Sequence, residues 1–156
     1  MIHFYYGYGK GKTSSAVGLG MRANGAGLKV LFVQFLKDNK SSELNAVPFE
    51  VFTAPDKLPF NPSKEEYQPW VDLALDAVSH SDCDLIILDE FADVINSFIP
   101  MDYALKVLDT LTDKEVVITG HIEFNELVEK ADYVTHFGSV KHPYTKGVKA
   151  RKGIEY

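Results

Sequence analysis

The stretch Tyr5-Tyr6-Gly7-Tyr8-Gly9-Lys10-Gly11-Lys12-Thr13-Ser14 decides the fold that we expect for the rest of the chain. An apolar run precedes it at 2–6, and a helix-like run of small residues follows it at 14–25. A strand, a glycine-rich turn and a helix in this order build a phosphate-binding loop, because glycines let several backbone N–H groups point inward. The start of the helix adds unpaired N–H groups and the positive end of its dipole.

Two side chains of this loop have predicted roles in binding ATP and its metal ion. Lys12 is expected to reach the terminal phosphates of ATP, and the Thr13 hydroxyl to hold Mg²⁺. The usual motif has a further glycine where Tyr6 stands, so the sequence predicts a variant of the loop. The alternative is a glycine-rich turn that only connects strand to helix. The predicted ATP-binding residues are Gly7, Tyr8, Gly9, Lys10, Gly11, Lys12, Thr13 and Ser14.

A second signal is the apolar run Leu85-Ile86-Ile87-Leu88, which is closed by Asp89 and Glu90. In phosphate-loop NTPases an aspartate at such a strand end holds Mg²⁺, and ligands gather at the carboxyl ends of parallel strands. We therefore predict Thr13, Asp89 and Glu90 as the metal site, with Lys12, Thr13 and Glu90 as catalytic residues. The alternative for the two carboxylates is an acidic turn after a buried strand.

The composition limits the classes of function. A length of 156 residues favours one domain, spanning 1–156. The net charge of −6 argues against nucleic-acid and membrane-surface partners. The single Cys83 excludes an internal disulfide and cysteine-based metal clusters. No run of about 18 apolar residues indicates a transmembrane helix, and the N-terminus runs directly into a strand, so a cytoplasmic protein without a signal peptide is expected.

The hydrophobic pattern alternates between strands and helices along the chain. This alternation predicts an α/β fold with a mainly parallel sheet flanked by helices. Ser63 and Glu66 have the spacing of a helix capping box. The expected strands are 2–6, 29–36, 49–53, 84–89, 115–119 and 133–137; the expected helices are 13–26, 64–79, 101–111 and 125–130; the expected loops are 37–46 and 54–62.

Further short stretches make the sequence similar to a known family. They are Gly18-Leu19-Gly20-Met21-Arg22, Gly27-Leu28-Lys29-Val30, Val33-Gln34-Phe35-Leu36-Lys37, Ile118-Thr119-Gly120, Ala131-Asp132-Tyr133-Val134-Thr135, Lys141-His142-Pro143 and Gly153-Ile154-Glu155-Tyr156. With the loop and the acidic strand end, they resemble the ATP:corrinoid adenosyltransferases of the cobalamin pathway. The resemblance covers most of the chain, and the family's loop also lacks the usual first glycine.

The resemblance implies a RecA-like phosphate-loop fold, a homodimer and an enzyme of cobalamin biosynthesis or salvage. In that family a reduced Co(I) corrinoid attacks the 5′ carbon of MgATP and tripolyphosphate leaves, so a reducing electron-transfer protein is an implied partner. Phe60 is the candidate for an apolar wall beside the corrinoid. Arg22 and His142 are further candidates for corrinoid binding.

The sequence also departs from the family pattern. Pro62 stands where the family often has Trp, His121 where it commonly has Arg, and His136 where it commonly has Glu. We expect both histidines to be surface or hydrogen-bonded residues; the alternative is that they bind a metal. Two other functions stay open: an ATP hydrolase or kinase on the same core, and a nucleotide-binding regulatory or corrinoid-carrying protein with little turnover.

Overall fold

A six-stranded parallel sheet forms the centre of the computed structural model, which describes residues 1–37, 41–55 and 62–156. Its strand order is β3-β2-β4-β5-β1-β6, and each of the strand pairs is parallel. The expected α/β fold of the phosphate-loop NTPase type is confirmed. The strands are β1 (Ile2–Tyr6), β2 (Val30–Gln34), β3 (Glu50–Thr53), β4 (Leu85–Asp89), β5 (Glu115–Gly120) and β6 (Tyr133–His136).

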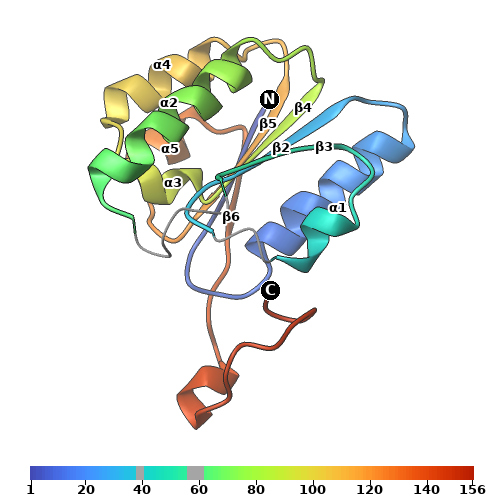
Figure 1. Cartoon of the computed structure of the whole chain (residues 1–156), viewed down its shortest axis with the longest axis vertical. Coiled ribbons are helices and arrows are strands. Elements are labelled where there is room, and N and C mark those ends of the chain that lie inside the picture. Colours follow the sequence, from blue (N-terminus) through green and yellow to red (C-terminus); the bar gives the residue numbers. More distant parts are fainter. Residues whose placement is uncertain (38–40, 56–61) are drawn as a thin grey trace.

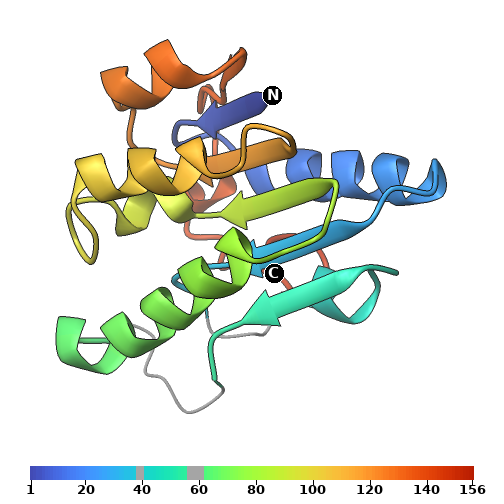
Figure 2. The same ribbon diagram turned by 90° about the horizontal axis from the view of Figure 1, so that it is seen from above.

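Helices cover both faces of this sheet (Figure 1). On one face lies α1 (Lys12–Gly25), and the other is covered by α2 (Lys64–Ser79), α3 (Phe91–Val94), α4 (Met101–Asp109) and α5 (Asn125–Lys130). Figure 2 shows the same layers from above, with the strands running side by side between the helices. Two short 3₁₀ helices, η1 (Ser42–Asn45) and η2 (Pro143–Lys146), lie in the connecting segments. No helix in the described residues is both long and apolar enough to cross a membrane.

The side chains of each central strand alternate between two hydrophobic clusters. In β4, Ile86 and Leu88 pack in the larger cluster with the α2, α3 and α4 side chains, whereas Leu85 and Ile87 pack in the smaller cluster under α1. Because both faces are covered, the central strands are apolar over most of their length. Burial on two faces explains the near-continuous apolar runs in the sequence.

The close approach of α1 to the sheet depends on its small residues. Ala16 and Ala23 are buried, and a Cβ on Gly20 would lie 3.0 Å from the Ile87 side chain. The small residues therefore let α1 pack closely against the strands. Gly18 takes no part, because a Cβ there would meet nothing within 4 Å.

The helix over 64–79 has the predicted ends. The Ser63 hydroxyl accepts from the Glu66 N–H, and the Glu66 carboxylate accepts from the Ser63 N–H, so the capping box is confirmed. Trp70, Ala74 and Leu75 are buried on this helix, whereas Leu73 is exposed. The sequence also missed α3, η1 and η2, because each spans only four residues and shows little periodicity.

The strand order brings the two sequence signals together. β5 separates β1, which leads into the glycine-rich loop, from β4, which ends at Asp89. Because the strands are parallel, their carboxyl ends share one edge of the sheet, where ligands bind in open α/β folds. After β6 the chain runs away from the sheet through η2 and then returns, so that the C-terminus lies near the start of α1 (Figure 1).

Candidate active site

The glycine-rich loop is packed against the segment that follows β6. The Gly9 N–H donates to the Phe137 carbonyl (2.7 Å), and the Gly7 N–H donates to the Gly120 carbonyl (3.1 Å). A Cβ on Gly7 would lie 2.5 Å from the Phe137 oxygen, and one on Gly9 would lie 2.7 Å from the Gly138 oxygen. Glycine is therefore required at both positions by the close passage of another backbone. The two N–H groups hold the loop in shape.

The start of α1 supplies the donors of an anion site. Gly11 is the N-cap residue, with φ of 118°, and it carries no side chain that could cap the helix. The N–H groups of the first helical turn have no partner within the helix, and the helix dipole favours negative charge there. No side chain of the N-cap residue accepts a hydrogen bond from these N–H groups. They are therefore suited to bind phosphate oxygens.

Lys12 curls back over the loop that precedes it. Its side chain is buried, and Nζ donates to the carbonyls of Gly7 (2.6 Å) and Gly9 (3.2 Å). Burial lowers the pKa of the Lys12 ammonium, although the carboxylates of Glu90, Asp93 and Asp89 oppose this shift. The loop carbonyls thus hold a poorly hydrated cation beside the start of α1, where it can face a phosphate chain.

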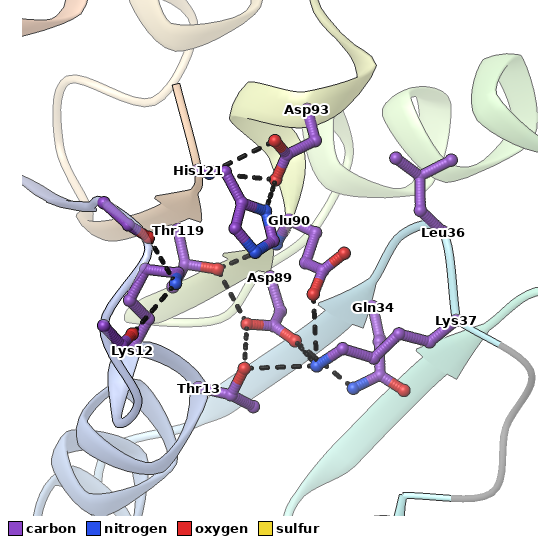
Figure 3. Close-up of polar contacts among 12 residues, drawn as sticks. Lys12, Thr13, Gln34, Leu36, Lys37, Asp89, Glu90, Asp93, Thr119 and His121 are labelled. Atoms are coloured by element: carbon purple, nitrogen blue, oxygen red, sulfur yellow. Dashed lines mark hydrogen bonds and ion pairs between the residues drawn. The ribbon is translucent and has the colours of Figure 1, made fainter. Parts of the chain in front are cut away.

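Asp89 is the centre of the polar network at the sheet edge (Figure 3). The residue is fully buried, and one carboxylate oxygen accepts from the hydroxyls of Thr13 (2.9 Å) and Thr119 (2.7 Å). The other oxygen accepts from the Lys37 ammonium (2.8 Å) and the Gln34 amide (3.3 Å). The strands β2, β4 and β5 and the helix α1 each contribute a residue to this network.

Glu90 sits beside Asp89 in an unusual backbone conformation. Its φ of 60° is in the left-handed region, and its N–H donates to the Thr119 hydroxyl (2.8 Å). One carboxylate oxygen lies 3.7 Å from Lys37 Nζ. Burial raises the pKa of Glu90, with the Lys37 charge opposing. A strained residue held in place by its neighbours is typical of functional sites.

His121 stands at the end of β5, close to the loop. Both the His121 N–H and its ring Nδ1 lie 3.1 Å from the Asp93 carboxylate. The hydrogen bond to Asp93 raises the pKa of His121 against the effect of burial. The Tyr8 ring lies 5.5 Å from the His121 ring. His121 is thus a hydrogen-bonded residue, as expected, while His136 stacks obliquely on Tyr6 at 5.0 Å.

One cavity of about 430 Å³ collects most of the predicted residues. Its lining includes the loop, the carboxyl edge of the sheet and the last four residues of the chain. The tail is tied to this cavity by Lys10, which donates to the Ile154 carbonyl, and by the Ser42 hydroxyl, which donates to the Tyr156 carbonyl (3.1 Å). The lining residues are Tyr8, Gly9, Lys10, Gly11, Lys12, Thr13, Ser14, Lys37, Ser41, Ser42, Glu43, Glu90, His121, His142, Gly153, Ile154, Glu155 and Tyr156.

The predicted corrinoid residues do not all lie together. His142 lines the cavity with the loop. Arg22 lies in the last turn of α1 and lines a different cavity, with Leu28 and Tyr133. Phe60 lies outside the described residues. The part of the binding site that would face a corrinoid therefore stays a prediction.

Three of the four hydrogen-bond partners of Asp89 were not predicted from the sequence. Gln34 ends β2, Lys37 follows it, and Thr119 lies near the end of β5. All three lie in stretches that carried the family resemblance, but nothing in the local sequence marks them as site residues. Only the order β2-β4-β5 places them around the end of β4.

The whole chain matches a known family. The family model described as ATP:corrinoid adenosyltransferase BtuR/CobO/CobP matches residues 1–156. The chain belongs to the corrinoid adenosyltransferase family. It is 31% identical over 168 residues to a corrinoid adenosyltransferase of Escherichia coli K12, covering all of this chain and 85% of that protein. It is also 31% identical over 167 residues to a corrinoid adenosyltransferase of Pseudomonas aeruginosa, covering 96% of this chain and 80% of that one.

A third relative is also a corrinoid adenosyltransferase. The corrinoid adenosyltransferase of Salmonella typhimurium is 28% identical over 171 residues, covering all of this chain and 85% of that protein. The resemblance drawn from the sequence is confirmed at the level of the family. The loop, the acidic strand end and the C-terminal segment that carried it meet around one cavity.

Proposed function

We propose that this chain transfers the 5′-deoxyadenosyl group of MgATP to the cobalt of a reduced Co(I) corrinoid, within cobalamin biosynthesis or salvage. One observation carries the proposal: in a chain of this family, the glycine-rich loop and Glu90 face a single cavity. In the reaction a Co–C bond forms while the bond between the 5′ carbon and oxygen breaks. The electron pair of the broken bond leaves with tripolyphosphate.

The loop would stabilise the leaving group. Tripolyphosphate carries roughly four negative charges, and fixed donors aimed at developing charge are an effective catalytic device. Lys12 supplies a buried ammonium, and the first turn of α1 supplies N–H groups and its dipole. Co(I) is itself a strong nucleophile, so the task left to the protein is to position ATP and corrinoid.

The oxygens at the sheet edge fit a hard cation. Thr13 Oγ1, Asp89 Oδ2 and Glu90 Oε1 converge on one ammonium nitrogen, at 3.1, 2.8 and 3.7 Å. This convergence suits Mg²⁺, which takes one or two carboxylates and completes its shell with phosphates and water. When bound there by Thr13, Asp89 and Glu90, Mg²⁺ would neutralise phosphate charge.

The remaining expectations belong to the same proposal. We propose a cytoplasmic homodimer that receives its corrinoid in the Co(I) state from a reducing electron-transfer protein, without nucleic-acid or membrane partners. His142 lines the same cavity as the loop, which supports a corrinoid contact there. Phe60 remains the candidate for the apolar wall.

Product analysis separates this function from the alternatives. Incubation with MgATP and reduced cobalamin should yield tripolyphosphate in the phosphorus NMR spectrum, whereas a hydrolase or kinase yields ADP. A regulatory or carrier protein would bind both ligands and yield neither product. Lys12→Ala should abolish turnover and weaken ATP binding, because the charge on the phosphates is lost. Full activity in Lys12→Ala would remove the loop from the proposed site.

A further inference from the structure

Lys37 occupies the point where the proposed metal ligands converge (Figure 3). It follows β2 and reaches across to the end of β4, with 22% of its side chain exposed. Its ammonium contacts Asp89 (2.8 Å), Thr13 (3.1 Å) and Glu90 (3.7 Å). A divalent ion bound by these same oxygens would compete directly with the ammonium. The two cations cannot share the position.

The backbone conformation of Leu36 helps to fix the position of Lys37. Leu36 has φ of 52°, a left-handed conformation that is sparsely populated for a branched residue. The Leu36 N–H donates to the Tyr67 hydroxyl at 2.6 Å, and Tyr67 is buried on α2. Such conformations persist only where the surroundings over-determine them. The ammonium is therefore directed into the site by the fold.

Lys37 lies between two carboxylates and can neutralise part of their negative charge. Glu90 lines the cavity that is to receive a polyphosphate, and the buried Asp89 carboxylate contacts the same Lys37 ammonium. Like charges repel strongly at a site of low dielectric constant, so the carboxylates need a cation before an anion can approach. Lys37 supplies one positive charge, and its flexible four-carbon stem lets the ammonium move while remaining in the same cavity.

We propose that Lys37 is a built-in counter-ion of the Asp89–Glu90 pair, which a divalent cation displaces, and that the displaced ammonium then contacts the phosphate chain. The inference rests on the proposed binding of MgATP. It makes Lys37 a phosphate-binding residue whose position depends on the metal. A purely structural ion pair would hold the fold together and leave the affinity for the metal unchanged.

Manganese binding without nucleotide tests the first half of the inference. Mn²⁺ affinity, measured by electron paramagnetic resonance, should rise about fivefold or more in Lys37→Met, because a competing cation is removed. Lys29→Met is the matched control. Lys29 precedes the same strand and pairs with Asp82 at 2.6 Å, far from the loop cavity. Its substitution should leave Mn²⁺ affinity unchanged.

Nucleotide binding tests the second half. In EDTA, ATP affinity should fall about fivefold or more in Lys37→Met, because uncovered carboxylates repel the phosphates. Lys37→Arg keeps the charge and should restore most of the ATP affinity. Mn²⁺ affinity that is unchanged or weaker in a folded Lys37→Met protein would overturn the inference, and so would unchanged ATP affinity in EDTA.

A measurement on the unaltered chain covers the case in which Lys37→Met fails to fold. With ¹³C-labelled lysine, saturating Mg²⁺ should shift the Cε resonance of Lys37 and leave that of Lys29 in place. A Lys37 resonance that does not move would overturn the inference. Failure of the proposed function has a different signature: the chain would bind Mn²⁺ and ATP as described yet adenosylate no corrinoid.

Discussion

Two lysine–aspartate pairs lie at opposite edges of the sheet, and they differ in burial far more than in distance. Lys29 and Asp82 meet at 2.6 Å with side chains 65% and 80% exposed. Lys37 and Asp89 meet at 2.8 Å with side chains 22% and 0% exposed. Exposed pairs contribute little because water screens them, whereas breaking a buried pair leaves an uncompensated charge.

The two aspartates also differ in their hydrogen-bond partners. The carboxylate of Asp89 also accepts from Thr13, Thr119 and Gln34, so four donors are committed to one buried group. At the other edge, Asp82 lies in the segment between α2 and β4. A short ion-pair distance therefore does not identify a functional site, whereas burial with convergent partners does.

The largest effect is expected from Asp89→Asn. The asparagine amide would bring an NH₂ group toward hydroxyl, amide and ammonium donors that the carboxylate now satisfies, so the variant should lose about 3–5 kcal/mol of unfolding free energy. Urea unfolding measures this loss, and turnover should vanish with it. Asp82→Asn is the matched control, with an unchanged urea midpoint. Equal losses of unfolding free energy in Asp89→Asn and Asp82→Asn would show that the buried and the exposed pair contribute alike.

Glu90→Gln should have the next largest effect, and on function more than on stability. Burial raises the pKa of Glu90, so the neutral amide relieves a desolvated charge while it removes an anionic ligand of the proposed metal. Turnover should fall and the Mg²⁺ concentration needed for half-maximal rate should rise. The measurement is a Mg²⁺ titration of the initial rate. A Mg²⁺ requirement equal to that of the unaltered chain would exclude Glu90 as a ligand.

His121 provides a smaller, pH-dependent contribution at the same edge. Its folded-state pKa is raised by Asp93, so the stabilisation is fully present below the unfolded value of about 6.5 and is lost as pH rises through the folded pKa. The ring is 40% exposed, so we expect less than about 1 kcal/mol. The unfolding free energies of the unaltered chain and His121→Asn should differ at pH 5.5 and converge above the folded pKa. A difference that grows with pH would contradict this sign.

Lys29→Met should have the smallest effect. Both partners of this pair are exposed, and salt screens such charges. The urea midpoint and the adenosylation rate should both match those of the unaltered chain. A clear loss of either would show that the exposed edge matters more than its burial suggests.

Much of the fold followed from local patterns in the sequence. The glycine-rich loop, the capping box at Ser63 and the apolar strand ending at Asp89 are each encoded within a few neighbouring residues. The meeting of Thr13 and Asp89 was predictable too, because parallel strands present their carboxyl ends at one edge.

The rest of the site depends on contacts between residues far apart in the chain. The roles of Lys37 and Thr119 arise from strand order, since β2 and β5 flank β4. The requirement for glycine at positions 7 and 9 arises from the passage of Phe137 and Gly138, and no property of the loop itself reports it. Arg22 is the opposite case. It lies in a stretch that resembles the family, but it lines a cavity other than the one beside the loop.

Adenosyl transfer to cobalt in this cavity can be observed directly, because the reaction changes the oxidation state and the axial bonding of the metal. The most direct measurement mixes the protein anaerobically with MgATP and chemically reduced cobalamin and follows the absorption spectrum of the cobalt. We expect the Co(I) spectrum to be replaced by that of a light-sensitive compound with a Co–C bond. A Co(I) spectrum that persists with several corrinoids while ADP accumulates would contradict this expectation.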